Sequence, residues 1–399
     1  MRAVTRPLGR DVDLNGFARG DGFLFVRDGV GLAGRGVAAR VPLTAVADVL
    51  AEMERDDGVG HPGCGPVALG VLPFRPSSGT ELVIPAVTVG KDADGTRWIT
   101  TVDGADAPAL GDVDLEPCPP PVAAAGGFTV APGVPVETYL AAVTAGRDEV
   151  RAGRMTKVVI ARDVLVTADR PLDVHAILLR LRAAFGSSYR YSMEGFVGAS
   201  PELLVARHGD VVRSHPLAGT APRTGDPTND ARLAAALITS TKDQVEHRVV
   251  IDVVHETLLP WCSYLDWEEE PSIVAVANVQ HLGTLIEGRL SSPAPNVLEM
   301  AQALSPTPAL GGHPREAAIE LIAAVEGFER GRYGGAVGWV DWAGNGTWAV
   351  AIRCAELSSD RRTARLFAGG GIVAESDPRA ELAETQAKFQ AMLSAILRA

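Results

Sequence analysis

The chain has 399 residues, of which 46% are hydrophobic and 22% charged, as expected for a globular protein of one large or two ordinary domains. Its net charge of −12 and the lack of a Lys/Arg-rich run argue against nucleic acid and anionic membranes as partners. We find no apolar signal segment and no run of about 18 apolar residues that could span a bilayer, so we expect a cytoplasmic protein. The four cysteines are scattered without a CxxC spacing, which suggests neither a zinc site nor a disulfide framework.

The first quarter of the chain reads as short strands broken by glycine. Within residues 1–103, the segment 81–102 predicts a hairpin that turns at Asp94-Gly95. Residues 104–133 are rich in Ala, Pro and Gly, and they predict an irregular connection.

The remainder of the chain mixes long strands with helices in no regular βαβ order. The final helix begins with Asp377 as N-cap and Pro378 at its first position. The pattern predicts an α+β (mixed α/β) architecture with stacked sheets. The predicted elements are a helix at 136–153, strands at 157–167, 188–199 and 202–217, a helix at 239–258, a hairpin at 334–359 turning at 344–346, and a strand at 363–373.

Two acidic pairs lie far apart in the chain, and each falls on a predicted helix. Asp243 and Glu246 are spaced i, i+3, as are Glu381 and Glu384, so each pair lies on one helix face. Glu246 borders an apolar stripe that we place on Val249, Val250 and Val253, where a carboxylate is costly unless a cation meets it. Two such helices could hold a divalent cation between them, although two solvated helix faces would give the same pattern.

Lys157 and Glu202 are candidate acid–base groups. Lys157 opens a nearly all-apolar strand, where loss of solvation could make it a base near neutral pH. Glu202 follows a Gly-Ala-Ser-Pro turn and precedes an apolar run, where a raised pKa would suit a general acid. A lysine with its ammonium in water and an ordinary turn glutamate remain the alternatives.

Several further segments could hold an anion. Gly219 and Thr220 share a turn whose backbone N–H groups could bind an oxyanion. Strand alternation places Arg353 on a face otherwise made of alanines, where it could grip a carboxylate or simply face solvent. Gly369, Gly370 and Gly371 end a strand and could bring backbone N–H groups close to a ligand, or form a flexible turn. Lys388 lies one turn beyond Glu384 and could neutralise it or point at an anion.

Nine motifs, taken in order, resemble those of the chorismate-utilising enzymes. That family includes isochorismate synthases, salicylate synthases, and the large components of anthranilate and aminodeoxychorismate synthases. The resemblance covers residues 135–399, whereas residues 1–134 match only loosely and are interpreted as a divergent strand-rich portion of the same fold. The motifs are KVVIAR, GASPELL, HPLAGTAPR, KDQVEH, VQHLGT, LSPTPALGG, AIRCAEL, AGGGIVAESDP and ELAETQAK.

The resemblance implies Mg²⁺-dependent chemistry on chorismate. The family's magnesium carboxylates fall on Glu246 and Glu381, with Asp243 and Glu384 at the neighbouring supporting positions. The family's substrate-carboxylate contacts fall on Tyr333, Arg353, Lys388 and the backbone of Gly369, Gly370 and Gly371, and His281 matches a family active-site histidine. Together with Gly219, Thr220 and Ala309, these residues are the candidate substrate-binding site.

Two positions, Lys157 and Ala309, favour the isochorismate synthase branch within that resemblance. Lys157 stands where ammonia-using members carry glutamine, and it matches the base that activates water. Glu202 matches the acid that protonates the hydroxyl leaving carbon 4. Ala309 stands where salicylate synthases carry threonine. A salicylate synthase and a catalytically silent binding or regulatory homologue remain the alternatives. We expect a monomer without a glutaminase subunit, in a siderophore, menaquinone or other secondary pathway.

Overall fold

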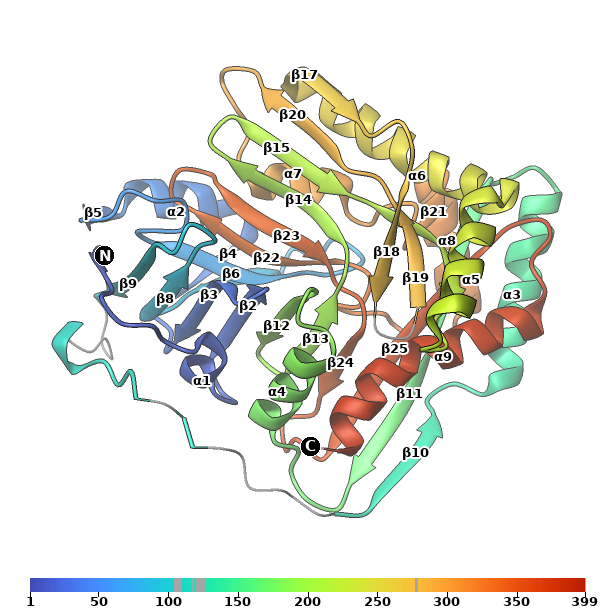
Figure 1. Ribbon diagram of the computed structural model, residues 1–399, viewed down its shortest axis with the longest axis horizontal. Helices are drawn as coiled ribbons and strands as arrows, with labels where there is room; N and C mark the ends of the chain where they lie inside the picture. Colours follow the sequence, from blue (N-terminus) through green and yellow to red (C-terminus); the bar gives the residue numbers. More distant parts are fainter. Residues whose placement is uncertain (104–109, 117, 120–125, 277–278, 399) are drawn as a thin grey trace.

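Two large sheets stack face to face in the computed structural model, and helices cover their outer faces (Figure 1). The structure describes residues 1–103, 110–116, 118–119, 126–276 and 279–398. This arrangement confirms the predicted α+β architecture of stacked, mostly antiparallel sheets flanked by helices. The helices are α1 (Leu14–Ala18), α2 (Val46–Glu52), α3 (Val136–Arg151), α4 (Val174–Ala184), α5 (Pro227–Thr239), α6 (Thr241–Leu258), α7 (Val297–Leu304), α8 (Arg315–Val325) and α9 (Pro378–Leu397).

The three sheets draw their strands from all along the chain. The larger sheet runs in the order β10 (Phe128–Pro132), β11 (Lys157–Ala168), β25 (Thr363–Ile372), β24 (Cys354–Leu357), β13 (Phe196–Ser200), β12 (Tyr189–Met193), β2 (Phe23–Arg27), β3 (Val30–Arg35), β8 (Val87–Lys91), β9 (Arg97–Val102), β1 (Arg2–Pro7) and β5 (Glu54–Asp57), and β21 (Gly312–His313) pairs with β11. The second sheet runs in the order β17 (Cys262–Trp267), β20 (Ile286–Leu290), β15 (Val211–His215), β14 (Leu203–His208), β23 (Gly346–Val350), β22 (Ala336–Asp341), β6 (Val67–Leu72), β7 (Glu81–Ile84) and β4 (Ala39–Pro42). A small third sheet consists of β16 (Leu217–Pro222), β19 (Val279–Gly283) and β18 (Ser272–Val276).

Large side chains fill the space between the two main sheets. Phe25 and Phe196 of the larger sheet belong to the same buried cluster as Val337 and Trp339 of the second. Burying each large apolar side chain stabilises the fold by roughly 1.5–3 kcal/mol. On the outer face of the larger sheet lie α1, α4 and α9, and on that of the second lie α2, α6 and α7. A strand in the middle of a sheet is therefore covered on both faces, which is why 157–167 is nearly all apolar.

The starts of the two acidic helices follow from their capping residues. The Asp377 side chain accepts hydrogen bonds from the backbone N–H groups of Arg379 and Ala380, so the predicted N-cap of α9 is confirmed. Ser240 caps α6 in the same way by accepting from the backbone of Asp243. Such caps satisfy N–H groups that have no partner within the helix.

The buried face of α6 differs from the predicted stripe. His247, Val250 and Val254 are buried, whereas Val249 and Val253 are only half-buried. A helix turns by 100° per residue, so the residues that face the core recur at three- and four-residue spacing, as 247, 250 and 254 do. Residues 249 and 253 lie on the flank of that buried face. The prediction was correct for Val250 and wrong for its two neighbours.

Three strand predictions were incomplete. Residues 188–199 and 202–217 each form a hairpin, β12–β13 and β14–β15, because Gly195 and Gly209 adopt positive φ angles of 80° and 64° that turn the chain. Within the expected irregular connection, residues 128–132 form β10, which pairs with β11. Hairpins at the predicted turns are confirmed as β8–β9 and β22–β23, with Gly95 and Gly344 at positive φ. The first was predicted too long, because residues 81–84 form β7 of the second sheet, where they pair with β4.

Arg353 does not lie on a strand, so the prediction from strand alternation was wrong. β23 ends at Val350 in the second sheet, and β24 begins at Cys354 in the larger sheet. The chain crosses between the sheets over the three residues in between, and Arg353 takes a φ of 52°, which is uncommon for a residue with a side chain. Alternation fails here because the two strands belong to different sheets.

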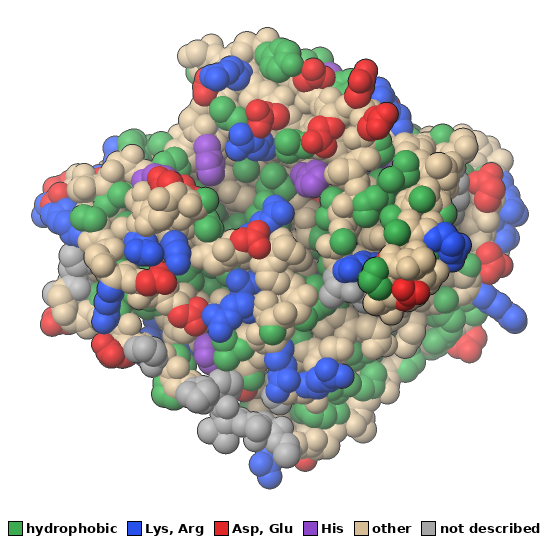
Figure 2. All heavy atoms as spheres, viewed as in Figure 1, with side chains coloured by type: hydrophobic (Ala, Val, Ile, Leu, Met, Phe, Trp, Pro, Cys, Tyr) green, Lys and Arg blue, Asp and Glu red, His purple; other side chains and the backbone are tan. Residues whose placement is uncertain are grey.

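None of the described helices is long and apolar enough to cross a membrane. On the face shown in Figure 2, basic and acidic side chains are interspersed, with hydrophobic side chains between them.

Candidate active site

A cavity of about 260 Å³ collects nearly all of the predicted site residues. Its walls come from β11 and β25 of the larger sheet, β16 and β19 of the small sheet, and helices α6 and α9. The predicted residues that line it are Lys157, Glu202, Gly219, Thr220, Asp243, Glu246, His281, Ala309, Tyr333, Arg353, Gly369, Gly371, Glu381, Glu384 and Lys388. Gly370 is not among the lining residues, although both of its neighbours in β25 are.

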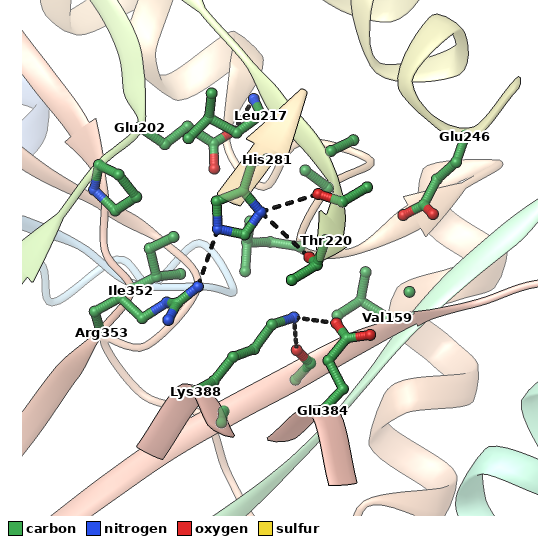
Figure 3. A pocket seen from close by; sticks show the side chains of 18 of the residues that line it. Val159, Glu202, Leu217, Thr220, Glu246, His281, Ile352, Arg353, Glu384 and Lys388 are labelled. Atoms are coloured by element: carbon green, nitrogen blue, oxygen red, sulfur yellow. Dashed lines mark hydrogen bonds and ion pairs between the residues drawn. The ribbon is translucent and has the colours of Figure 1, made fainter. Parts of the chain in front are cut away.

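Glu202 is a buried carboxyl group at one end of the cavity. It lies between β13 and β14, and only 3% of its surface is exposed. Burial raises the pKa of Glu202 to about 8, although a hydrogen bond from the backbone N–H of Leu217, 3.4 Å away, opposes that rise (Figure 3). The carboxyl group is therefore protonated at neutral pH and able to give up a proton.

Lys157 is the first residue of β11, as predicted, and its side chain is buried. Its Nζ lies 2.7 Å from Oε1 of Glu246 on α6. The alternative of an ammonium in water is excluded, since only 3% of the Lys157 side chain is exposed. The pairing also explains how Glu246 can stand beside an apolar stripe.

His281 orients Arg353 within the cavity. His281 Nδ1 lies 3.0 Å from the carbonyl oxygen of Gly219, which only accepts, so Nδ1 carries the proton. Burial, and then the charge of Arg353, lower the pKa of His281 to about 3, so its Nε2 is an unprotonated acceptor. Arg353 Nη2 donates to that Nε2 over 3.2 Å (Figure 3).

The other terminal nitrogen of Arg353 is buried and has no hydrogen-bond partner among the described residues. An unsatisfied buried guanidinium N–H is costly, and a carboxylate is its usual partner. The arrangement therefore suits a substrate carboxylate. Thr220 Oγ1, 3.2 Å from His281 Nδ1, lies beside the same group.

Gly219 and Thr220 lie within β16 rather than in a turn. The pairing of β16 with β19 shifts register between Ala218 and Ala221, and Gly219 has a φ of 70°. A Cβ atom at Gly219 would lie 3.2 Å from Cβ of Asp243. The glycine at this bulge thus lets β16 pass close to the acidic face of α6.

The three glycines lie inside β25, one residue short of its end, and they make room for carboxylates. A Cβ atom at Gly370 would lie 2.7 Å from Oε2 of Glu381, and one at Gly371 would lie 2.6 Å from Oε1 of Glu246. A side chain at either position would force the facing carboxylate to move. The Gly369 carbonyl accepts from Lys388 Nζ over 2.7 Å.

Lys388 combines the two interpretations left open by the sequence. Its Nζ lies 2.7 Å from Oε1 of Glu384, the predicted i, i+4 pair, and it also lines the cavity. Tyr333 is buried, stacks on Phe367 with ring centres 5.1 Å apart, and reaches towards Gly369.

The four carboxylates of the two helices offer oxygen ligands, which a hard divalent cation prefers. Mg²⁺ prefers oxygen ligands and keeps several waters, so one or two carboxylates suffice. Among the described residues, no three of these four side chains bring their ligand oxygens within 4.8 Å of one another. Three ligand atoms do lie that close at His61, Asp92 and Asp94, but those residues do not line the cavity. The four acidic residues that could hold the ion are Asp243, Glu246, Glu381 and Glu384.

Some wall residues were not predicted from the sequence. Val159, Leu217 and Phe367 line the cavity alongside the predicted set. Val159 was within reach of sequence reasoning, since it stands two residues after Lys157 on the same strand face. Leu217 and Phe367 carry no chemical signal and are placed by the packing of the sheets.

The sequence model described as chorismate binding enzyme matches residues 123–397 of this chain. The chain belongs to the chorismate binding enzyme family. A relative from Mycobacterium tuberculosis, provisionally named isochorismate synthase MenF, is 44% identical over 347 residues and covers 84% of this chain and 87% of its own length. Isochorismate synthase DhbC of Bacillus subtilis is 37% identical over 346 residues and covers 83% of this chain and 81% of its own length.

A solved member of the chorismate binding enzyme family shares the whole fold. It is DhbC from Bacillus anthracis, provisionally described as a 2,3-dihydroxybenzoate-specific isochorismate synthase. Its TM-score is 0.81 at 32% identity, covering 97% of this chain and 99% of that one. The coverage extends the likeness through residues 1–134, where sequence motifs are weak.

Proposed function

We propose that this chain is an isochorismate synthase that converts chorismate to isochorismate. The observation that carries the proposal is a buried carboxyl group, Glu202, whose pKa is raised to about 8 on the same cavity as the buried amine of Lys157. Two groups with different environments on one cavity are suited to donate and accept protons in one reaction. The relatives named as isochorismate synthases support the same assignment.

The reaction exchanges one water for another. Lys157 takes a proton from a water that adds to carbon 2 of the ring, the double bonds shift, and Glu202 gives its proton to the hydroxyl that leaves carbon 4. One water enters and one leaves, so the product is an isomer of the substrate. Holding the ring between the two groups is a positioning effect that lowers the barrier.

Arg353 and the acidic residues hold the two carboxylates of chorismate in this proposal. The free Arg353 Nη1 binds one carboxylate, with Tyr333 and Lys388 beside it. We assign Mg²⁺ to Glu246 and Glu381, with Asp243 and Glu384 in support; held there, it would supply positive charge for the other carboxylate. No glutaminase subunit is required, because water and not ammonia is the nucleophile.

Incubation of the purified protein with chorismate and MgCl₂, followed by chromatography, tests the proposal. Isochorismate as the product supports it. Salicylate with pyruvate would reassign the chain to the salicylate synthases, and an amino product that depends on ammonia would reassign it to the ammonia-using branch. If a folded protein consumes no chorismate, it is a silent homologue.

A further inference from the structure

A buried ion pair, and not a strand, closes one edge of β11 behind the cavity. β25 pairs with β11 along one side over residues 158–167. On the other side β21 pairs with 157–158 and β10 with 164–168. Among the residues that the structure describes, no strand pairs with 159–163 on that side. Glu326 and Arg330, which follow α8, fill the gap.

The pair takes over hydrogen bonds that a neighbouring strand would make. Arg330 Nη2 donates to the carbonyl oxygen of Val159 over 2.7 Å. The backbone N–H of Ala161 donates to Glu326 Oε1, also over 2.7 Å. Buried peptide groups need hydrogen-bond partners, and the ion pair provides them for the two β11 groups that no strand pairs with on this side.

Arg330 also fixes the loop that carries Ala309. Its Nη1 donates to the carbonyl oxygen of Leu310 over 2.7 Å. The neighbouring Gly311 carbonyl accepts from the backbone N–H of Val159 over 2.9 Å. The loop and the start of β11 are therefore tied to each other both directly and through one guanidinium.

The ion pair is closed off from water and held by two contacts. The side chains of Arg330 and Glu326 are 2% and 0% exposed. Arg330 Nε lies 2.9 Å from Glu326 Oε2, and its Nη2 binds Oε1. Buried ion pairs are often no more stabilising than apolar residues of the same volume, so stability alone does not account for one here.

Three groups of the cavity wall depend on this pair, although it does not line the cavity itself. Val159 and Leu310 are wall residues bound directly by Arg330. Tyr333 is a third, and its ring centre lies 5.7 Å from the guanidinium carbon of Arg330. Lys157 stands two residues before Val159 on the same strand.

We infer that Arg330, held by Glu326, is a positioning residue that sets the Lys157 end of β11 against the Ala309–Leu310 wall. The inference rests on the proposed function, because it takes Lys157 as the proton acceptor. A planar guanidinium can reach a carboxylate and two carbonyl oxygens at once, whereas a lysine ammonium is a single point charge. The substitution Arg330→Lys therefore keeps the buried charge and removes the simultaneous contacts.

The test compares Arg330→Lys with wild type in kcat, KM, Mg²⁺ affinity and local hydrogen exchange. We expect kcat per folded molecule to fall by about tenfold to a hundredfold, because small misplacements at a reacting centre have effects of that size. KM is expected to change less than kcat, and Mg²⁺ binding is expected not to weaken, since Arg353 and the α6 and α9 carboxylates do not contact the pair. Amide exchange is expected to speed up in peptides covering 157–163 and 305–313 and to stay unchanged in α6 and α9.

Two further variants keep the test decisive. Glu326→Gln retains an acceptor for the Ala161 N–H, so its kcat is expected to fall less than that of Arg330→Lys. If Arg330→Lys does not fold, Glu326→Gln takes its place in the comparison with wild type. Arg365→Lys is the matched control, because Arg365 Nε pairs with Asp163 on β11 over 2.7 Å but does not line the cavity. It is expected to keep the wild-type kcat.

The outcomes separate this inference from the proposed function. If wild type makes no isochorismate, the proposed function fails. The positioning role is overturned if wild type is active and both variants keep its kcat per folded molecule. It is also overturned if exchange in 157–163 and 305–313 is unchanged, or if Mg²⁺ affinity falls in step with kcat.

Discussion

Lys157 Nζ lies 2.7 Å from Oε1 of Glu246, with 3% and 12% of the two side chains exposed. The proposed proton acceptor thus contacts a proposed magnesium ligand directly. Like charges repel strongly at short distance where water is excluded, so an ammonium and a divalent cation compete for this carboxylate. The proposed reaction requires the uncharged form of Lys157, because an ammonium cannot accept a proton, so the ion pair with Glu246 has to be given up before the water is activated.

Replacing Lys157 is expected to improve metal binding while stopping turnover. In Lys157→Met we expect Mg²⁺ to bind about tenfold more tightly, a change of 1.4 kcal/mol, as measured by calorimetry without substrate. Isochorismate formation should be lost. Lys91→Met, whose lysine pairs with Asp11 away from the cavity, is the control and should change neither quantity. Equal Mg²⁺ affinity in Lys157→Met and wild type would show that the two cations do not compete.

Removing a magnesium carboxylate is expected to abolish both metal binding and activity. Glu246→Gln and Glu381→Gln keep the shape of the side chain but lose the charge that Mg²⁺ prefers. EDTA should stop the wild-type enzyme, and added MgCl₂ should restore it. Glu256→Gln, an exposed position on α6, is the control. Full activity in either cavity variant would refute the metal assignment.

The acid role of Glu202 predicts a loss of activity at high pH. Burial raises the pKa of Glu202 to about 8, so its protonated form is present below that pH and is lost as pH rises through it. We expect kcat/KM, which reports the ionisation of the free enzyme, to fall tenfold per pH unit above about 8. Glu202→Gln should have very low activity without this decline. A wild-type kcat/KM that stays constant from pH 7 to 10 would contradict the assignment.

The same raised pKa has a consequence for stability. The folded state favours protonated Glu202, so its stabilising contribution is complete below the unfolded pKa and declines as pH rises through about 8. The melting temperature of Glu202→Gln relative to wild type should therefore increase between pH 5 and pH 9. Thermal unfolding at both pH values measures this, and a constant difference would contradict the burial of the charge.

The contact between His281 and Arg353 predicts an effect on substrate binding. His281→Ala removes the acceptor for Arg353 Nη2, so the guanidinium loses its fixed direction. We expect KM for chorismate to rise by about tenfold, with a smaller change in kcat. His255→Ala, outside the cavity on α6, is the control. An unchanged KM would show that other contacts hold Arg353.

Ala309→Thr tests the position that separates the synthase branches. Ala309 lines the cavity next to Leu310, so an added hydroxyl would face the substrate region. We expect the ratio of pyruvate to isochorismate to rise, as followed by coupled assay and chromatography. Ala303→Thr on α7, which is not a cavity residue, should leave the ratio unchanged. If Ala309→Thr also leaves the ratio unchanged, this position does not control pyruvate elimination in this protein.

The strongest local patterns of the sequence were sufficient to predict several of the helices and strands that surround the site. The nearly all-apolar run of β11, the cap at Asp377 and the glycine turn of β8–β9 depend on neighbouring residues, and each was predicted correctly. The order of nine motifs identified the family, and with it the cavity residues. Gly370 is the one member of that predicted set that is not among the lining residues, although it lies beside Glu381.

The sequence by itself determined which residue types are present and where long helices and strands form, since propensity, capping and periodicity act over a few residues. Only the tertiary structure decided how those residues act together. It brings Lys157 onto Glu246, turns Arg353 towards His281 at a crossing between sheets, and places Arg330 behind the wall. It also buries Glu202, and burial sets a pKa that depends on solvent exclusion by segments remote in the chain. Such contacts have no local pattern, because they arise from packing between distant elements.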